Sequence, residues 1–213
     1  MLVKFCGLTR QEDVNAANAL GADMCGFIFH EPSPRHISPY KASRLQSGAM
    51  RRVGVFVQQD IEEILQIMDE ARLDYAQLHG GQSMECAAAL GAERVIRVIW
   101  PQRYARPDLL QAELLRHADS CAYYLLDAGL QGGGWGKSLE WKDVSTLHAP
   151  HPWLLAGGLD ADKVAMALRL CHPDGLDFNS GVEVAPGEKN AQAMKAAVAA
   201  LKQYERKVLQ HGK

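Results

Sequence analysis

The sequence lacks several features that would by themselves define a class of function. Its five cysteines form no CxxC or CxxH spacing and are odd in number, which disfavours a disulfide framework and a zinc site. No apolar run reaches membrane-spanning length, and a strand-like run that begins at residue 2 leaves no room for a signal peptide. The formal net charge is −2 without a basic stripe, which argues against nucleic acid as a partner. We therefore expect a cytoplasmic protein that contacts neither membranes nor nucleic acid.

The sequence does contain a regular alternation of two patterns along its 213 residues. Short runs rich in apolar and β-branched residues predict strands at 2–6, 24–29, 52–57, 75–79, 95–100, 122–127, 153–157 and 176–180. Amphipathic segments with helical spacing include 11–20, 61–71, 84–90 and 162–170, and an Ala-rich segment at 190–209 predicts a long final helix. Gly21 and Gly91 are expected to end two of these helices in the left-handed conformation.

Eight strand–helix units predict an α/β fold of the closed (β/α)8 TIM-barrel type. The runs are continuously apolar, as buried parallel strands are, and their connections have the length of parallel crossovers. An open doubly wound sheet would usually show GxGxxG after the first strand, where Cys6-Gly7-Leu8-Thr9-Arg10 stands instead. No Pro- or Ser-rich linker interrupts the chain, so we expect residues 1–213 to form a single domain.

In such barrels the chemistry takes place at the carboxyl ends of the strands. Cys6 ends the first predicted strand and Asp127 the sixth, which makes the thiol and the carboxyl candidates for a proton-transferring pair. Gly157-Gly158 and Ser180-Gly181 follow the last two strands, where this fold often binds phosphate through backbone N–H groups. Each residue has a plainer alternative: a strand-end cysteine is often a buried apolar residue, an aspartate can cap a loop, and paired glycines can make a tight turn.

Three further candidates occupy predicted loops or strand ends. Arg35, between two prolines, is either a solvated charge or a partner for a substrate carboxylate. His79 is expected to be hydrogen-bonded in the barrel wall. Lys137 ends a glycine-rich segment that resembles a Walker A loop but has Gln131 at the first required glycine position. We interpret that segment as a flap over the barrel mouth, with Lys137 as an anion contact.

An ordered set of motifs carries a resemblance to one enzyme family. The motifs are Lys4-Phe5-Cys6-Gly7-Leu8-Thr9, Gly26-Phe27-Ile28-Phe29, Ser33-Pro34-Arg35, Val53-Gly54-Val55-Phe56, Gln77-Leu78-His79-Gly80, Leu126-Asp127, Gly133-Gly134-Trp135-Gly136-Lys137, Ala156-Gly157-Gly158-Leu159 and the segment 177–183. Together they resemble the phosphoribosylanthranilate isomerases of tryptophan biosynthesis, from residue 4 to about residue 186.

The resemblance implies a barrel that needs no cofactor or metal and binds a small phosphorylated substrate, as a monomer or a homodimer. It implies an Amadori rearrangement with Cys6 as general base and Asp127 as general acid, and Arg35 on the anthranilate carboxylate. Gln77, His79, Lys137 and Asp177 are further expected substrate contacts, and Gly157, Gly158, Asn179, Ser180 and Gly181 are the expected phosphate contacts. This chemistry requires the pKa of Asp127 to be raised or its proton supplied on binding, and the pKa of Cys6 to be lowered.

Three alternatives stay open from the residues alone. A ribulose-phosphate epimerase would use metal ligands at strand ends, where His79 is the plausible histidine. An indole-glycerol-phosphate synthase would use a lysine at a strand end, whereas Lys4 lies inside the first strand. A non-catalytic phosphate-ligand sensor would keep the glycine loops without needing both Cys6 and Asp127.

Overall fold

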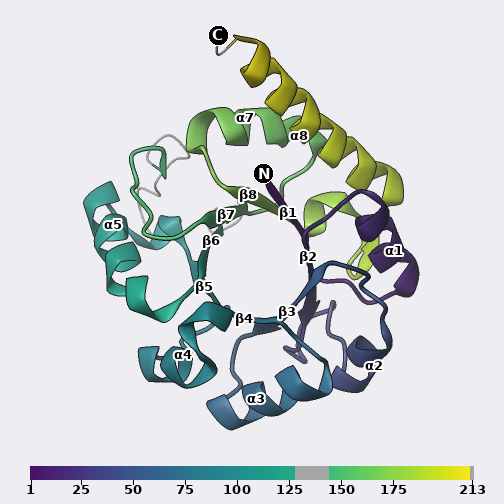
Figure 1. Cartoon of the computed structure of the whole chain (residues 1–213), viewed down its shortest axis with the longest axis vertical. Helices are drawn as coiled ribbons and strands as arrows, with labels where there is room; N and C mark the ends of the chain where they lie inside the picture. The colour runs from purple at the N-terminus through teal and green to yellow at the C-terminus, as the bar shows by residue number, and fades with distance from the viewer. Residues whose placement is uncertain (128–143, 212–213) are drawn as a thin grey trace.

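Eight parallel strands close into a barrel in the computed structural model, which describes residues 1–127 and 144–211 (Figure 1). The first strand pairs with both the second and the eighth, which closes the ring. The strands are β1 (Leu2–Phe5), β2 (Met24–Ile28), β3 (Arg51–Phe56), β4 (Tyr75–Leu78), β5 (Val95–Ile99), β6 (Tyr123–Asp127), β7 (Trp153–Ala156) and β8 (Gly175–Phe178). The predicted fold class is therefore confirmed, and each strand overlaps one of the predicted apolar runs.

Helices surround the ring of strands (Figure 1). They are α1 (Gln11–Ala19), α2 (Pro39–Arg44), α3 (Ile61–Glu70), α4 (Met84–Leu90), α5 (Pro107–Arg116), α7 (Ala161–Cys171) and α8 (Ala191–His211). Short 3₁₀ turns η1 (Ala92–Arg94), η2 (Pro101–Arg103), η3 (Ala118–Ser120) and η4 (Ser180–Val182) and a hairpin of β9 (Glu183–Ala185) and β10 (Glu188–Lys189) complete the described elements. Gly21 and Gly91 follow helices with positive φ values of 79° and 85°, as predicted, but the ψ of 118° takes Gly91 out of the left-handed helical conformation.

Successive side chains of each strand point alternately outward to the helices and inward to the barrel interior. Residues such as Phe5, Phe27, Phe56 and Phe178 point outward and are completely buried beneath the helices. The inward-pointing residues form a smaller apolar cluster inside the barrel that includes Met24, Val53, Ile96 and Leu125. Lys4 shares that inward direction, because it lies two residues before Cys6 on the same strand.

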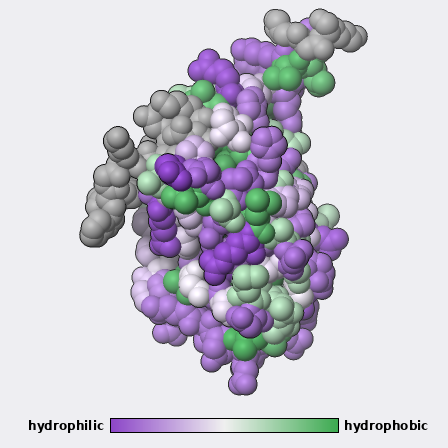
Figure 2. Space-filling view, turned by 90° about the vertical axis from the view of Figure 1, so that its left-hand side faces the viewer, coloured by the Kyte–Doolittle hydropathy of each residue, from purple (hydrophilic) through white to green (hydrophobic). Residues whose placement is uncertain are grey.

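The final helix runs along the outside of the barrel. It packs on α7 and contacts α1, and its carboxyl end extends past the ring (Figure 1). Figure 2 shows a side of the molecule where hydrophilic residues predominate and hydrophobic ones are scattered. Within the described part of the chain, no helix combines the length and the apolar composition needed to cross a membrane.

Candidate active site

A cavity of about 800 Å³ opens at the carboxyl ends of the strands. It is lined by ten of the residues singled out from the sequence: Cys6, Gln77, His79, Asp127, Gly157, Gly158, Asp177, Asn179, Ser180 and Gly181. Arg35 is absent from the lining, and Lys137 lies outside the described residues. The fold thus brings together in one concave site residues that are up to 175 positions apart in sequence (from Cys6 to Gly181).

The Cys6 thiol lies at the inner wall of this cavity and is only 4% exposed. Gly26 on the neighbouring strand makes room for it, since a Cβ there would come within 2.8 Å of Cys6 Sγ. Burial raises the pKa of Cys6, and the nearby Lys4 ammonium acts in the opposite direction. The expectation of a lowered pKa is therefore wrong for Cys6 in this structure, because the sequence gives no measure of how completely the thiol is desolvated.

Asp127 and His79 lie close together among the residues that line the cavity. His79 Nε2 lies 4.0 Å from Asp127 Oδ2, and the imidazole meets the Trp100 ring edge-on with centroids 5.3 Å apart. Burial against the barrel wall lowers the pKa of His79 to about 4, and the positive charge of Lys4 adds to this effect. His79 is therefore neutral near pH 7. The expectation that its ring is hydrogen-bonded in the barrel wall is wrong for Nδ1, which is buried without a hydrogen-bond partner among the described residues.

We expect His79 to make stability depend on pH below neutrality. Its pKa is lower in the folded state than the ordinary value of 6.5, so the unfolded chain binds more protons between about pH 6.5 and pH 4. The free energy of unfolding should therefore fall as pH decreases through this window, and His79→Gln should flatten that part of the curve. Urea unfolding of both proteins at several pH values measures this. A His79 ring that titrates near 6.5 by NMR would contradict it.

A buried ion pair lies beneath the thiol, inside the barrel. Lys4 Nζ donates to Asp177 Oδ2 at 2.8 Å, and their side chains are 0% and 5% exposed. Asp177 Oδ1 and Gln77 Oε1 are buried without a hydrogen-bond partner among the described residues, and both residues line the cavity. These oxygens are placed to accept or share a proton with a bound molecule. Sequence reasoning missed the role of Lys4, although its position two residues before Cys6 was the available signal.

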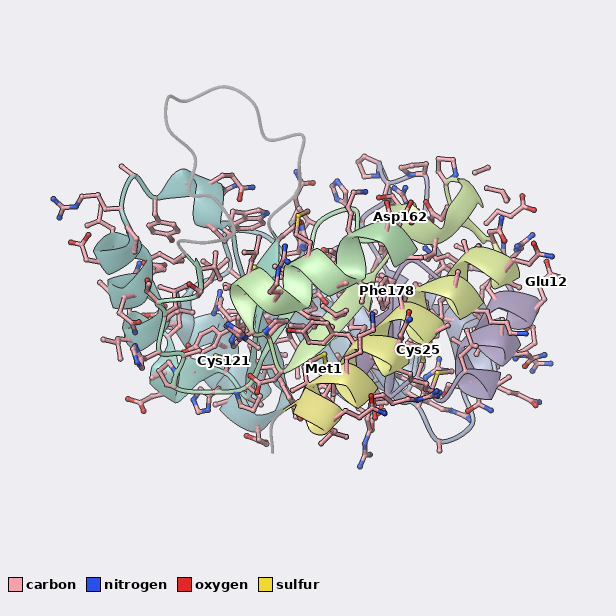
Figure 3. All side chains as sticks on the ribbon, turned by 90° about the horizontal axis from the view of Figure 1, so that it is seen from above. Met1, Glu12, Cys25, Cys121, Asp162 and Phe178 are labelled. Carbon is pink, nitrogen blue, oxygen red and sulfur yellow. The ribbon has the colours of Figure 1, made fainter. Side chains whose placement is uncertain are left out.

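The loops after β7 and β8 supply glycine backbone to the cavity. Gly157 and Gly158 have φ of 119° and 66°, and a Cβ on Gly158 would meet no atom within 4 Å. Gly181 is required for a different reason, because a Cβ there would come within 2.0 Å of the Leu159 carbonyl oxygen. Figure 3 shows Phe178 at the end of β8 and Asp162 at the start of α7, so a helix amino terminus follows the first of these loops. Such loops can bind an anion through their N–H groups.

Lys163 is a second residue that sequence reasoning missed. It belongs to the first turn of α7 and lines the cavity, and its Nζ donates to the Gly158 carbonyl oxygen at 2.8 Å and pairs with Asp160. A lysine five positions after a glycine pair was the available signal. Its ammonium supplies positive charge beside the glycine loops.

Arg35 is held next to the cavity by the hairpin that follows β8. Its guanidinium donates to Glu183, with Nη2 to Oε2 at 2.7 Å, and Glu183 also accepts from the buried Lys189 at 2.8 Å. Gly7 leaves room for the Arg35 side chain, because a Cβ at position 7 would come within 2.9 Å of Arg35 Cδ. Burial opposes ionisation of Glu183, but hydrogen bonds from Arg35 and Lys189 outweigh it and lower its pKa. Arg35 is therefore fixed beside the loop that carries Cys6.

No group of three or more His, Cys, Asp or Glu within residues 1–127 and 144–211 is arranged to hold a metal ion. The absence of a metal and of a cofactor stays a prediction. A closed eight-stranded barrel with titratable side chains gathered at the carboxyl ends of its strands has the architecture of the (β/α)8-barrel enzymes.

Comparisons with known proteins identify the family within this class. The family model described as N-(5′-phosphoribosyl)anthranilate (PRA) isomerase matches residues 3–200. A protein of Desulfovibrio desulfuricans named N-(5′-phosphoribosyl)anthranilate isomerase is 64% identical over 199 residues, which are 93% of this chain and 94% of that protein. The chain therefore belongs to the N-(5′-phosphoribosyl)anthranilate isomerase family, and it is an isomerase.

Solved structures support the same assignment. The phosphoribosylanthranilate isomerase of Thermotoga maritima is 30% identical and has a TM-score of 0.82, with 95% of this chain and 100% of that chain covered. A second structure, 30% identical with a TM-score of 0.78 and the same coverage, is of an isomerase in complex with reduced 1-(o-carboxyphenylamino)-1-deoxyribulose 5-phosphate.

Proposed function

We propose that this protein converts N-(5′-phosphoribosyl)anthranilate to 1-(2-carboxyphenylamino)-1-deoxyribulose 5-phosphate in tryptophan biosynthesis. The observation that carries the proposal is the gathering of Cys6, Asp127 and both glycine loops around one cavity. A structural neighbour bound to a reduced form of this product supports the same substrate class. We propose further that residues 1–213 act as one domain.

Asp127 is the general acid in this proposal. It protonates the furanose ring oxygen as the C1′–O bond breaks, which opens the ring to a Schiff base. Its position at the end of β6 and at the rim of the cavity leaves space for a sugar between it and Cys6. The neutral His79 beside it places no positive charge next to the acid.

Cys6 is the general base. Its thiolate takes the proton from C2′ of the Schiff base, and the resulting enolamine tautomerises to the ketone. In this proposal the sugar carbons lie between a base directly after β1 and an acid that ends β6. Holding the substrate by its two ends orients these carbons without a further catalytic group.

The phosphate end binds at the loops after β7 and β8. Backbone N–H groups at Gly157, Gly158, Ser180 and Gly181 are the proposed donors, Asn179 adds its side-chain amide, and Lys163 supplies charge. Gln77 and Asp177 contact the sugar from the cavity wall. Lys137, also a proposed anion contact, lies outside the described residues.

Arg35 binds the anthranilate carboxylate at the other end of the substrate. Glu183, itself held by Lys189, accepts hydrogen bonds from Nε and Nη2 of the guanidinium, so Nη1 can donate to a ligand. A preorganised guanidinium loses little side-chain entropy when it meets a carboxylate.

Arg35→Met should weaken catalysis by about 2–5 kcal/mol in kcat/KM, the range for a desolvated charge pair that loses one partner. The loss should largely vanish with an analogue that lacks the anthranilate carboxylate. Steady-state kinetics on both substrates measures this, and Arg94→Met, at an arginine outside the cavity, serves as the control. Equal losses on both substrates would show that Arg35 has another role.

The experiment that tests the whole proposal is a fluorescence assay with freshly prepared phosphoribosylanthranilate. Loss of the substrate signal with formation of the ketose product supports an isomerase. Tight binding of the substrate without turnover would instead favour a phosphate-ligand sensor, which needs the loops but neither Cys6 nor Asp127.

A further inference from the structure

Lys4 occupies an unusual place for a charged side chain. It is completely buried in the barrel interior, and its backbone is in register with Asp177 on the adjacent strand β8. It lies on the inward side of β1, two residues before Cys6, and its positive charge and the negative charge of an ionised Cys6 favour each other. One cation therefore pairs with Asp177 and also acts electrostatically on the thiol of Cys6.

We propose that Lys4 is a positioning residue whose ammonium is the counterion shared by Asp177 and Cys6, so that a single proton is distributed between the carboxyl and the thiol. In one form the Cys6 thiol is neutral and the Asp177 carboxylate pairs with Lys4. In the other form the proton has left sulfur for Asp177, and the thiolate pairs with Lys4. In both forms Lys4 is positive, one of the two acidic groups is negative and the other is neutral. The active thiolate therefore forms without a change in the net charge of the buried site. This inference rests on the proposed role of Cys6 as the base.

The electrostatics of the cluster agree with a shared proton. Burial raises the pKa of both Cys6 and Asp177, while Lys4 lowers both. Asp177 opposes ionisation of Cys6, so a neutral Asp177 favours the thiolate. Oδ1 of Asp177, which has no hydrogen-bond partner among the described residues, is available to carry the proton.

Other charged or titratable groups face the same space from several elements. Lys189 on β10 favours the Cys6 thiolate, and the remaining groups that line the cavity are His30, His79, Asp127 and Lys163. His79 is neutral, and Lys163 already pairs with Asp160. Lys4 is therefore the cation whose removal should change Cys6 most, because its electrostatic effect on the thiol is larger than that of Lys189.

Two variants are expected to move the Cys6 pKa in opposite directions. Asp177→Asn removes the competing anion and should lower the pKa, and a decrease of about one in the pKa gives roughly tenfold more thiolate at neutral pH. The double variant Lys4→Met with Asp177→Asn removes both charges and should raise the pKa, because the loss of Lys4 outweighs the loss of Asp177. The double variant leaves no unpaired buried charge from this pair, so it should fold even if Asp177→Asn does not.

Iodoacetamide alkylation of Cys6, followed peptide by peptide with mass spectrometry from about pH 6 to about pH 10, measures these changes without requiring catalysis. The expected order of the alkylation midpoints is Asp177→Asn below the parent and the double variant above it. Lys163→Met, which removes a cation paired elsewhere, should leave the midpoint unchanged, and circular dichroism checks the fold of each protein.

A double variant with a midpoint equal to or below that of the parent would overturn the proposal. So would an unchanged or raised midpoint in folded Asp177→Asn, or a Cys6 that resists alkylation at every pH in all variants. These outcomes are separate from failure of the proposed function, which would appear as a parent protein that does not turn over phosphoribosylanthranilate whatever its thiol does.

Discussion

Cys6→Ala and Asp127→Asn are each expected to lower kcat by about 10²–10⁴-fold, the range for a lost proton-transferring group. In the proposed mechanism Cys6, directly after β1, is the base and Asp127, at the end of β6, is the acid, so each variant should stop a different proton transfer. Cys6→Ala removes a buried thiol of modest volume, and Asp127→Asn preserves shape, so both proteins should fold. Single-turnover kinetics with saturating substrate measures the chemical step directly.

Cys121→Ala is the matched control for the thiol. Cys121 is also buried, at 3% exposure, but it precedes β6 and therefore lies at the opposite end of the barrel from the cavity. It should retain parental kcat. Near-parental kcat in Cys6→Ala would remove Cys6 from the mechanism, and near-parental kcat in Asp127→Asn would require another acid.

Gly158→Val should raise KM strongly, on the order of 10- to 100-fold for each charge-assisted hydrogen bond lost to the phosphate. A Cβ at Gly158 would extend into open space beside the glycine loops, where the phosphate is proposed to bind, so the side chain would exclude the anion. kcat should fall as well if the phosphate contacts hold C2′ against Cys6. Inorganic phosphate should inhibit the parent competitively and the variant much less, and EDTA should leave the parent unchanged.

Gly21→Val separates backbone strain from loss of phosphate binding. Gly21 has φ of 79° against 66° for Gly158, and a Cβ at either position would meet no atom within 4 Å. Gly21 follows α1, away from the cavity, so its variant carries a similar conformational penalty with no expected change in KM. Equal kinetic effects in the two variants, or a crystal with phosphate bound elsewhere, would reject the proposed phosphate site.

The sequence predicted the barrel well because its strands are buried on both sides. Runs such as 122–127 are continuously apolar and could be recognised without knowing their partners. α2 and α5 were harder: α2 spans six residues, Pro39–Arg44, and each begins with a proline. Such segments give little periodicity and resemble loops in sequence.

The candidate site was predicted as a set of strand ends, but not as a network. The sequence places Cys6, Asp127 and the glycine loops at the carboxyl ends of predicted strands. Because parallel strands all end at the same side of the barrel, these residues could be expected at its mouth. The sequence could not show that Lys4 points inward toward Asp177, or that Glu183 holds Arg35, because these contacts join residues 173 and 148 positions apart. The depth of burial that raises the pKa of Cys6 is likewise a property of the assembled barrel.

The contact between Lys4 and Asp177 also ties the site to protein synthesis. Lys4 is synthesised early, but its partner Asp177 is added 173 residues later. At about 5–20 residues per second this is a delay of roughly 10–35 s. Until then the first strand has no eighth strand to pair with, and an ammonium that must end in a dry interior remains hydrated. A nascent chain that stops before β8 can therefore present neither a closed ring nor a paired Lys4. Closure of the barrel and formation of the Lys4–Asp177 pair in the candidate site become the same late event.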